Sequence, residues 1–133
     1  MESNTTPLEV SFAGMDLKQA KCGIFCKWLG VCTSLLSMDL SRMGLDDEQG
    51  KLIASYVRKN NTLRKLELEG NVLGPKTAME FGKTLKTNTA LKTLNLESNT
   101  LASLDGSDSI GMYEFLKFFP ENKTLLSLNI ANN

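Results

Sequence analysis

The chain of 133 residues has no histidine, only three cysteines and three prolines, and a single tryptophan. Without histidine it lacks the commonest general base of enzymes and the usual nitrogen ligand of zinc. It also has no excess of either charge, because 15 basic and 15 acidic side chains give a net charge of zero. A dedicated nucleic-acid binder usually carries a basic surplus, so we expect no nucleic-acid partner.

Long hydrophobic runs are lacking too. The longest apolar stretch, residues 23–32, is interrupted by Lys27 and is shorter than the roughly 20 residues that span a bilayer. The first ten residues, MESNTTPLEV, are polar and do not have the charged start and apolar run of a signal peptide. An odd number of cysteines without an export signal favours a reducing compartment. We therefore expect a cytoplasmic protein with no membrane partner.

The three cysteines, Cys22, Cys26 and Cys32, lie close together and allow two interpretations. A zinc site would need a fourth ligand, and histidine is absent. Alternatively, Cys22 and Cys26 share one face of a helix, where cysteine behaves as a small apolar residue. We predict buried or partly buried free thiols, with no metal and no cofactor.

What the chain does contain is a repeat. The same order of apolar positions recurs in LLSMDLSRMGLD (35–46), LRKLELEGNVLG (63–74), LKTLNLESNTLA (91–102) and LLSLNIANN (125–133). Met38, Leu66 and Leu94 follow one another at 28 residues, and Leu128 follows after 34. A fixed period indicates a repeated supersecondary unit. A fainter first copy is expected with Leu8 and Val10 at the positions of Met38 and Leu40.

Each copy predicts a strand, a turn and a helix. Leu66 and Leu68 are two residues apart, so they lie on one face of a strand. Asp46 or Asp47 is expected to cap one helix, and Pro75 to open the next. Three helical stripes are expected to be buried: Leu52, Ile53 and Val57; Ala78, Phe81 and Leu85; Met112, Phe115 and Phe119. Asn60, Asn88 and Asn122 follow these helices, where left-handed backbone geometry is expected.

One such unit cannot bury its own apolar face, but stacked neighbours can, as in a right-handed β–α solenoid. The 28-residue period with a full helix resembles the leucine-rich repeat in its long, ribonuclease-inhibitor-like form, over about residues 5–133. The resemblance implies an α/β fold with a parallel sheet on the concave side and helices on the convex side. It also implies that Asn71 and Asn99 have a structural role, satisfying backbone groups in the turns. Ala13 and Met43 are expected at the same position in the first two turns, which must be built differently.

The repeats divide one domain into units of about 5–32, 33–60, 61–88 and 89–122, with a partial unit at 123–133. The first unit is expected to be an atypical cap. Because Asn133 occupies the position of Asn71 and Asn99, the pattern stops within a repeat. We therefore expect a fragment of a longer protein, or a last strand covered by a neighbour.

No sequence pattern indicates catalysis. Motifs for a nucleophile elbow, a phosphate-binding loop and a metalloprotease site are absent. Glu67 and Glu69 form a carboxylate pair, but two solvated carboxylates stay ionised and are not tuned for proton transfer. The chain is therefore not expected to be an enzyme or to bind a small-molecule substrate.

The longer interval before Leu128 holds a polar insertion, residues 103–109, with Asp105 and Asp108. A calcium loop of the EF-hand type counted from Asp105 would need glycine and glutamate where Ile110 and Leu116 stand. The insertion is therefore expected to be a flexible loop, or a contact for a partner.

The remaining candidate site is the row of polar side chains that alternate with the leucines of each strand. It comprises Ser37, Asp39 and Ser41; Lys65, Glu67 and Glu69; Thr93, Asn95 and Glu97; and Ser127, Asn129 and Ala131. Of these, the residues predicted to bind a partner on the concave face are Ser37, Asp39, Lys65, Glu67, Glu69, Asn95, Glu97 and Asn129. Either these are solvated strand faces with no partner, or they form a shallow acidic groove for a protein segment that carries lysine or arginine.

The stretches LKTLNLESNTL and NKTLLSLNIANN also resemble the leucine-rich half of the tropomodulins and leiomodins, over about residues 60–133. That family caps or nucleates actin filaments, so the resemblance implies actin or another cytoskeletal protein as a partner. No motif for the family's actin contacts is matched, and no contact residue is assigned. The sequence therefore predicts a protein-binding leucine-rich-repeat scaffold, with an actin filament regulator as the alternative.

Overall fold

In the computed structural model, residues 8–16, 23, 26–27, 31–103 and 109–133 are described. In this part of the chain five parallel strands form one sheet, in the order β1-β2-β3-β4-β5. The strands are β1 (Leu8–Ser11), β2 (Leu35–Asp39), β3 (Lys65–Glu67), β4 (Thr93–Asn95) and β5 (Ser127–Asn129). The helices are α2 (Asp47–Lys59), α3 (Pro75–Thr87) and α4 (Ile110–Phe118), followed by the 3₁₀ turn η1 (Phe119–Glu121).

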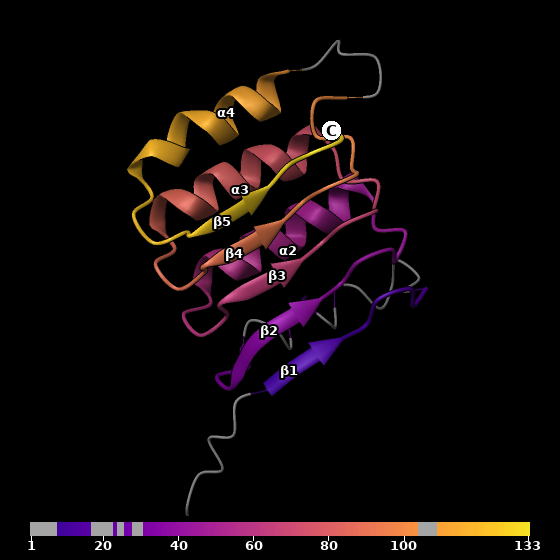
Figure 1. The fold of residues 1–133 in the computed structure, drawn as a ribbon, viewed down its shortest axis with the longest axis vertical. Coiled ribbons are helices and arrows are strands. Elements are labelled where there is room, and N and C mark those ends of the chain that lie inside the picture. The colour runs from indigo at the N-terminus through magenta and orange to yellow at the C-terminus, as the bar shows by residue number, and fades with distance from the viewer. Residues whose placement is uncertain (1–7, 17–22, 24–25, 28–30, 104–108) are drawn as a thin grey trace, which may run out of the picture.

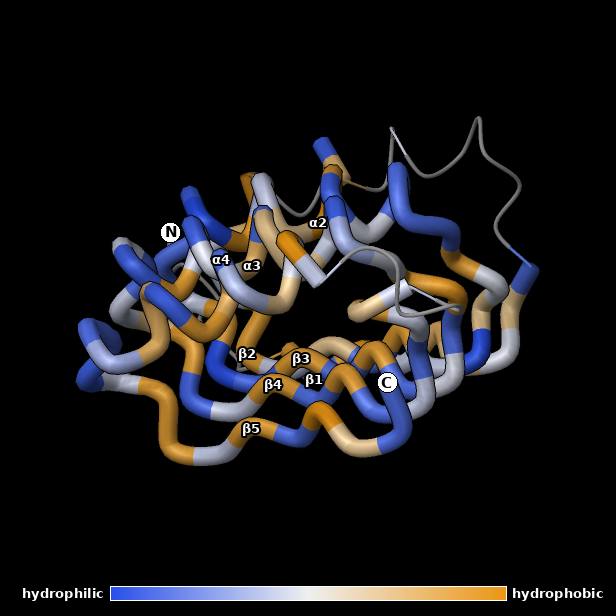
Figure 2. The backbone as a smooth tube through the Cα atoms, turned by 90° about the horizontal axis from the view of Figure 1, so that it is seen from above, coloured by the Kyte–Doolittle hydropathy of each residue, from blue (hydrophilic) through white to orange (hydrophobic). Residues whose placement is uncertain are grey.

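The helices form a second layer on one face of the sheet, and the chain advances by one strand and one helix at a time (Figures 1 and 2). The register aligns Met38 with Leu66, Leu66 with Leu94, and Leu94 with Leu128. Met38, Leu66 and Leu94 are 0% exposed and belong to one continuous core between the two layers. The predicted α/β leucine-rich-repeat solenoid is confirmed.

The predicted alignment of the first repeat is wrong. Val10, not Leu8, is the partner of Met38, and an irregularity between Leu8 and Glu9 shifts Leu8 opposite Leu35. The first interval is therefore also 28 residues, which places Met15, rather than Ala13, at the position of Asn71. The predicted and observed alignments of the first repeat differ by two residues. A shift of two residues keeps every side chain on the same face of the strand, so the apolar pattern fits both alignments.

The starts of the helices agree with the sequence, whereas two of the buried positions do not. Asp46 caps α2 in a capping box with Gln49, and Pro75 stands in the first turn of α3. Leu52 was expected in the core but is 44% exposed, because Ala54 takes the inward position beside Ile53. Phe119 is 37% exposed, since α4 ends at Phe118 and the turn η1 carries Phe119 off the helix face.

The expectation of left-handed backbone at Asn60, Asn88 and Asn122 is also wrong. These residues have φ of −81°, −75° and −75° and extended backbone. Their side chains, rather than their backbone conformation, explain the recurrence. The amide of Asn88 donates to the carbonyls of Val57 and Asn60 at 2.8 Å, and its oxygen accepts from the N–H groups of Ala90 and Leu91 at 2.9 Å.

Asp47 links two repeats by capping the helix of its neighbour. The N-cap residue of α3 is Gly74, which has no side chain to accept a hydrogen bond. Instead, the Asp47 carboxylate of α2 accepts from the N–H groups of Gly74 (2.9 Å), Lys76 (3.0 Å) and Thr77 (2.8 Å). The hydroxyl of Thr77 donates to it at 2.7 Å. An anionic acceptor at a helix N-terminus is stabilising because the unpaired N–H groups and the helix dipole both favour it.

We expect Asp47→Ala to lower the free energy of unfolding by about 1–3 kcal/mol, because several N–H groups of α3 lose their acceptor. Glu48→Ala is the matched control. Glu48 is the adjacent carboxylate, and it pairs with Lys76 at the surface, where ion pairs contribute little to stability. Urea unfolding followed by circular dichroism measures both. Equal losses in the two variants would contradict capping across repeats.

The same contact gives stability a pH dependence. Burial raises the pKa of Asp47, but the hydrogen bonds from Thr77, Lys76 and Gly74 outweigh it and hold the pKa below the ordinary 3.8. A carboxylate whose pKa is depressed on folding stabilises the folded state above its unfolded pKa. We expect this stabilisation to be complete above about pH 5 and to be lost as the pH falls below 3.8 through the folded pKa. Urea unfolding measured across this pH range should show a smaller change in the free energy of unfolding for Asp47→Asn than for wild type.

Candidate functional site

The sheet face opposite the helix layer presents the polar side chains that the sequence singled out. We call it the strand face, and define it by Ser37, Asp39, Lys65, Glu67, Glu69, Asn95, Glu97 and Asn129. The register arranges its residues in rows across the strands. One row runs Ser11, Asp39, Glu67, Asn95, Asn129, and a second runs Glu9, Ser37, Lys65, Thr93, Ser127. The structure thus brings side chains that are 28 or 34 residues apart in sequence onto one surface.

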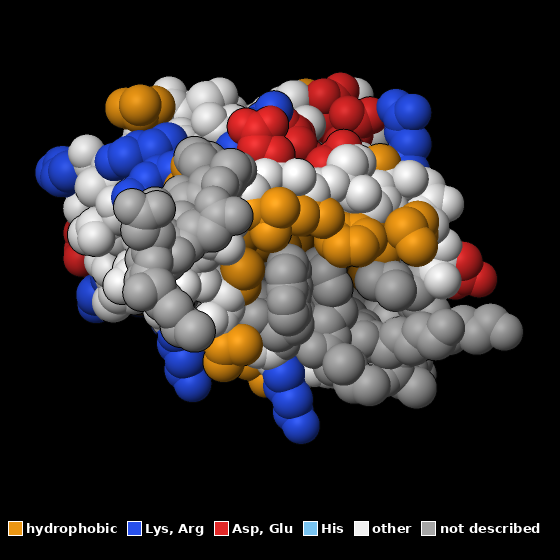
Figure 3. All heavy atoms as spheres, turned by 90° about the horizontal axis from the view of Figure 1, so that it is seen from below, with side chains coloured by type: hydrophobic (Ala, Val, Ile, Leu, Met, Phe, Trp, Pro, Cys, Tyr) orange, Lys and Arg blue, Asp and Glu red, His pale blue; other side chains and the backbone are white. Residues whose placement is uncertain are grey.

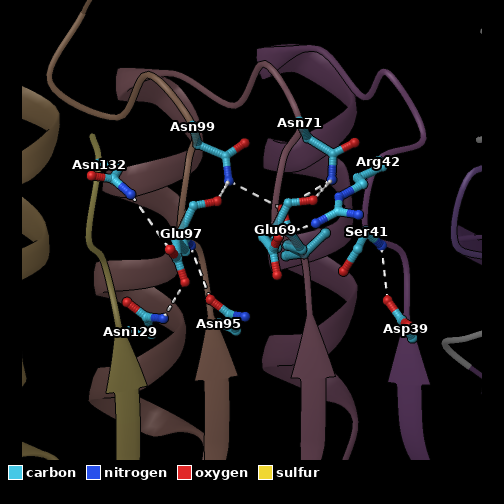
Figure 4. A network of polar contacts seen from close by, with 11 residues as sticks. Asp39, Ser41, Arg42, Glu69, Asn71, Asn95, Glu97, Asn99, Asn129 and Asn132 are labelled. Atoms are coloured by element: carbon cyan, nitrogen blue, oxygen red, sulfur yellow. Dashed lines mark hydrogen bonds and ion pairs between the residues drawn. The ribbon is translucent and has the colours of Figure 1, made fainter.

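The charges on the strand face are partly compensated. Glu69 forms an ion pair with Arg42 at 2.7 Å (Figure 4). Glu67 forms a second ion pair with Lys65 at 3.1 Å. Arg42 was missed by the sequence analysis because it follows the strand and does not share the alternating pattern. Its side chain is 73% exposed, so its charge is close to solvent. The face therefore carries a smaller negative surplus than its carboxylates alone suggest.

Asp39 is held as a carboxylate by its neighbours. Burial raises its pKa, but hydrogen bonds from Ser41 and Ser11, together with the charge of Lys65, lower the pKa below the ordinary 3.8. The backbone N–H of Ser41 donates to it at 2.9 Å and the hydroxyl of Ser11 at 3.3 Å. Asp39 is therefore a fixed negative charge at neutral pH and is unsuited to giving up or taking a proton.

Glu97 joins the last two strands of the face. Its carboxylate accepts from the side-chain amides of Asn129 at 2.7 Å and Asn132 at 3.4 Å. Its backbone N–H donates to the side-chain oxygen of Asn95 at 3.0 Å. Figure 4 shows these side chains pointing toward one another across neighbouring strands. The acidic group is thus presented on a surface that is already ordered by hydrogen bonds.

The turn asparagines, Asn71 and Asn99, lie in the turns that follow β3 and β4 (Figure 4), and they are only 6% exposed. The side-chain oxygen of Asn71 accepts from the N–H groups of Met43 and Leu45 at 3.0 Å, in the turn of the preceding repeat. Its amide donates to the carbonyls of Leu40 at 3.0 Å and Leu68 at 2.9 Å. Asn99 makes the corresponding contacts one repeat later, accepting from Leu73 and donating to Leu68 and Leu96. These bonds fix the direction in which each strand ends.

A second feature of the turns was not recognised in the sequence. The residue before each turn asparagine position has a positive φ: Gly14 (74°), Arg42 (55°), Gly70 (69°), Ser98 (54°) and Asn132 (56°). Glycine tolerates a positive φ best. Gly14 and Gly70 are separated by two repeat lengths, and this recurrence in the sequence could have predicted the left-handed residue of each turn. A side chain at the position of Gly70 would meet Cγ of Arg42 at 2.9 Å. The glycine therefore leaves room for the Arg42 side chain on its way to Glu69.

The cysteines and the polar insertion are only partly described. Cys26 is buried and Cys32 half-buried, whereas Cys22 lies outside the described residues. Asp105 and Asp108 of the insertion also lie outside them. Among the described residues, no three or more histidines, cysteines, aspartates or glutamates gather in a way that could hold a metal ion. In the same residues, no helix has the length and apolar character to cross a membrane.

Comparisons with known proteins agree with this fold. No protein-family model matches the chain. It is 28% identical over 124 residues to leucine-rich repeat-containing protein 45 of Gallus gallus, a match that covers 93% of this chain and 18% of the relative. The chain thus spans less than a fifth of the length of that curated relative.

Two solved structures are similar over nearly the whole chain. One is actin-binding site 2 of leiomodin-1, with a TM-score of 0.79 and 25% identity, covering 96% of this chain and 73% of that one. The other is the C-terminal domain of a Caenorhabditis elegans tropomodulin, with a TM-score of 0.76 and 16% identity, covering 98% and 77%. The chain is a leucine-rich-repeat solenoid, and the predicted likeness to tropomodulin and leiomodin is confirmed over more residues than the motifs of 60–133 had indicated.

Proposed function

We propose that this chain is a non-enzymatic, cytoplasmic protein-interaction module that binds a basic polypeptide segment on its strand face. The observation that carries the proposal is the arrangement of Asp39, Glu67, Glu69 and Glu97 on one ordered surface opposite the helix layer. Among the described residues, Lys65 and Arg42 form ion pairs with these carboxylates, and their side chains are 52% and 73% exposed. Exposed ion pairs of this kind are weak, so an incoming lysine or arginine competes with them at little cost.

The geometry supports binding rather than catalysis. The carboxylates of the face either form ion pairs or accept hydrogen bonds from amides and hydroxyls, and the pKa of Asp39 is lowered rather than raised. A general acid at neutral pH needs a carboxylate with a raised pKa. Ordered acidic groups in rows suit recognition of an extended segment, because each strand presents its side chains at the same height and the strands are about 4.8 Å apart.

Charge reversal tests this surface. We expect the triple variant Glu67→Lys, Glu69→Lys and Glu97→Lys to weaken binding of a synthetic lysine- and arginine-rich peptide by at least about tenfold, because attraction becomes repulsion. The control is Glu48→Lys, Glu114→Lys and Glu121→Lys, which changes the net charge equally away from the strand face. Fluorescence anisotropy of the labelled peptide measures the affinity, and circular dichroism checks folding. Equal weakening in both triple variants would reject the strand face as the site.

Actin is a second candidate partner, favoured by the likeness to actin-binding site 2 of leiomodin-1. If this chain acts on actin, it should change the rate of pyrene-actin assembly or disassembly at a filament end. The strand-face triple variant should reduce that effect, and its control triple should not. No change at either filament end would reject actin as the partner. The more general proposal, a basic segment bound on the strand face, would still be tested by the peptide measurement.

A further inference from the structure

A different surface of the solenoid gathers positive charge. The chain passes from helix to strand in three stacked loops, residues 60–64, 88–92 and 122–126. Beside or within them lie Lys59, Arg64, Lys86, Lys92 and Lys123, which we call the basic edge. Among the described residues, none of these five side chains forms an ion pair with a carboxylate. Figure 3 shows several Lys and Arg side chains at the left of the view and most of the visible Asp and Glu side chains at its upper middle and right.

The helix dipole explains only part of this cluster. Lys59 stands in the last turn of α2 and Lys86 in that of α3, where a cation is stabilised by the negative end of the dipole. Arg64, Lys92 and Lys123 come after the helices have ended. Lys123 still serves a helix end, because its Nζ donates to the carbonyl of Pro120 in η1 at 2.9 Å. Arg64 and Lys92 stand beyond the helices, and like charges brought together in this way repel one another unless an anion is present.

The loops hold these cations at fixed positions. The backbone N–H of Lys92 donates to the carbonyl of Arg64 at 2.8 Å, so the two residues stand side by side at the starts of β3 and β4. Nη1 of Arg64 donates to the carbonyl of Ala90 at 3.0 Å, which lays the guanidinium along the next loop. A guanidinium has five N–H donors, so this bond leaves others for a ligand. The asparagine amides described above brace the loops, and a ligand would therefore meet a preorganised surface.

An exposed apolar side chain continues the same row. The N–H of Leu126 donates to the carbonyl of Lys92 at 2.8 Å, and the Leu126 side chain is 82% exposed. At the C-terminal ends of α3 and α4, Nζ of Lys86 and Nζ of Lys117 lie 4.8 and 5.3 Å from the centre of the Phe118 ring. The surface thus combines cations with isolated apolar groups.

This combination discriminates between anionic ligands. Nucleic acid is disfavoured because the chain has no net positive charge to hold a phosphate backbone. A membrane surface is disfavoured because stable attachment needs a broad apolar face, whereas this row offers a single highly exposed leucine. A polypeptide in which acidic and apolar residues mix fits both the cations and Leu126.

We propose that the basic edge is a second docking surface, for an acidic polypeptide segment that places carboxylates on Arg64, Lys92 and Lys123 and an apolar side chain against Leu126. It is distinct from the strand face and takes a segment of opposite charge. A solenoid with both surfaces can hold two partners, or two parts of one partner, at the same time.

The test measures anisotropy of a fluorescein-labelled peptide of repeated Glu-Glu-Leu. We expect saturable binding by the wild-type chain, weakened at least about tenfold by Arg64→Glu with Lys92→Glu. Binding should also weaken as salt is raised. The charge-matched control, Lys51→Glu with Lys76→Glu at the starts of α2 and α3, should bind like wild type. Leu126→Ser should weaken the leucine-containing peptide but leave binding of poly-glutamate unchanged.

Three results would overturn the proposal. The first is equal weakening by both double variants, provided that circular dichroism shows both to be folded. The second is binding of poly-uridine RNA or of phosphatidylserine vesicles, but not of the acidic peptide. The third is association of the chain with itself that competes with the peptide and is lost in the basic-edge variant. The strand-face triple variant serves as a cross-check, because it should still bind the acidic peptide.

Discussion

Replacing Leu94 with alanine is expected to lower the free energy of unfolding by about 2–5 kcal/mol. Leu94 is 0% exposed and lies at the centre of β4, aligned with Leu66 on one side and Leu128 on the other. Truncation removes buried methyl groups and leaves a cavity between the sheet and the helix layer. Because neighbouring repeats share this leucine row, the cavity weakens two interfaces rather than one.

Urea unfolding followed by circular dichroism measures the loss. Leu126→Ala is the matched control, since Leu126 is the same residue type but 82% exposed. It should change stability by no more than about 0.5 kcal/mol. Similar midpoints for Leu94→Ala and Leu126→Ala would mean that the assignment of the inner face of the strands is incorrect.

The second large effect is expected at Asn71, where alanine should cost about 2–4 kcal/mol. The change removes an acceptor from the N–H groups of Met43 and Leu45 and a donor from the carbonyls of Leu40 and Leu68. These backbone groups lie in a buried turn, so water replaces the lost partners only in part. The loss should appear in two successive turns, because Asn71 bonds to its own repeat and to the one before it.

Amide hydrogen exchange identifies where the structure loosens. The amides of Met43 and Leu45 should exchange faster in Asn71→Ala, whereas those of the α3–β4 loop should keep their protection. Asn61→Ala provides the control at an exposed asparagine in the same repeat and should leave both regions unchanged. Uniformly faster exchange throughout the chain would argue for global destabilisation rather than a local role in the turns.

The repeat could be predicted from the sequence because burial acts on every copy in the same way. Leu66 and Leu94 recur at one period, and only a stack of identical units places both in a shared core. The alignment of the first repeat with the second could not be predicted in this way. Val10 and Leu8 are both apolar and face the same side, so only the hydrogen-bond register separates the two alignments.

The polar contacts between repeats were harder to foresee, because they depend on direction and not on burial. The sequence offered Asp46 and Asp47 as alternative caps, and each turned out to cap a different helix. Likewise, Arg42 gave no periodic signal, since it faces Glu69 only through a left-handed turn. The strand-face residues were placed on one surface by strand alternation, but that they bind a partner remains a prediction.

The stacking of strands in one register is the central claim, and disulfide cross-linking tests it most directly. Lys65 and Thr93 are register partners on the strand face, so cysteines at both positions should join without backbone movement, which a disulfide requires. The offset pair, cysteines at Lys65 and Asn95, should join far less. Peptide mapping by mass spectrometry under mild oxidation distinguishes the new link from the native cysteines. Our account predicts a dominant link between positions 65 and 93, and a dominant link in the offset pair would contradict it.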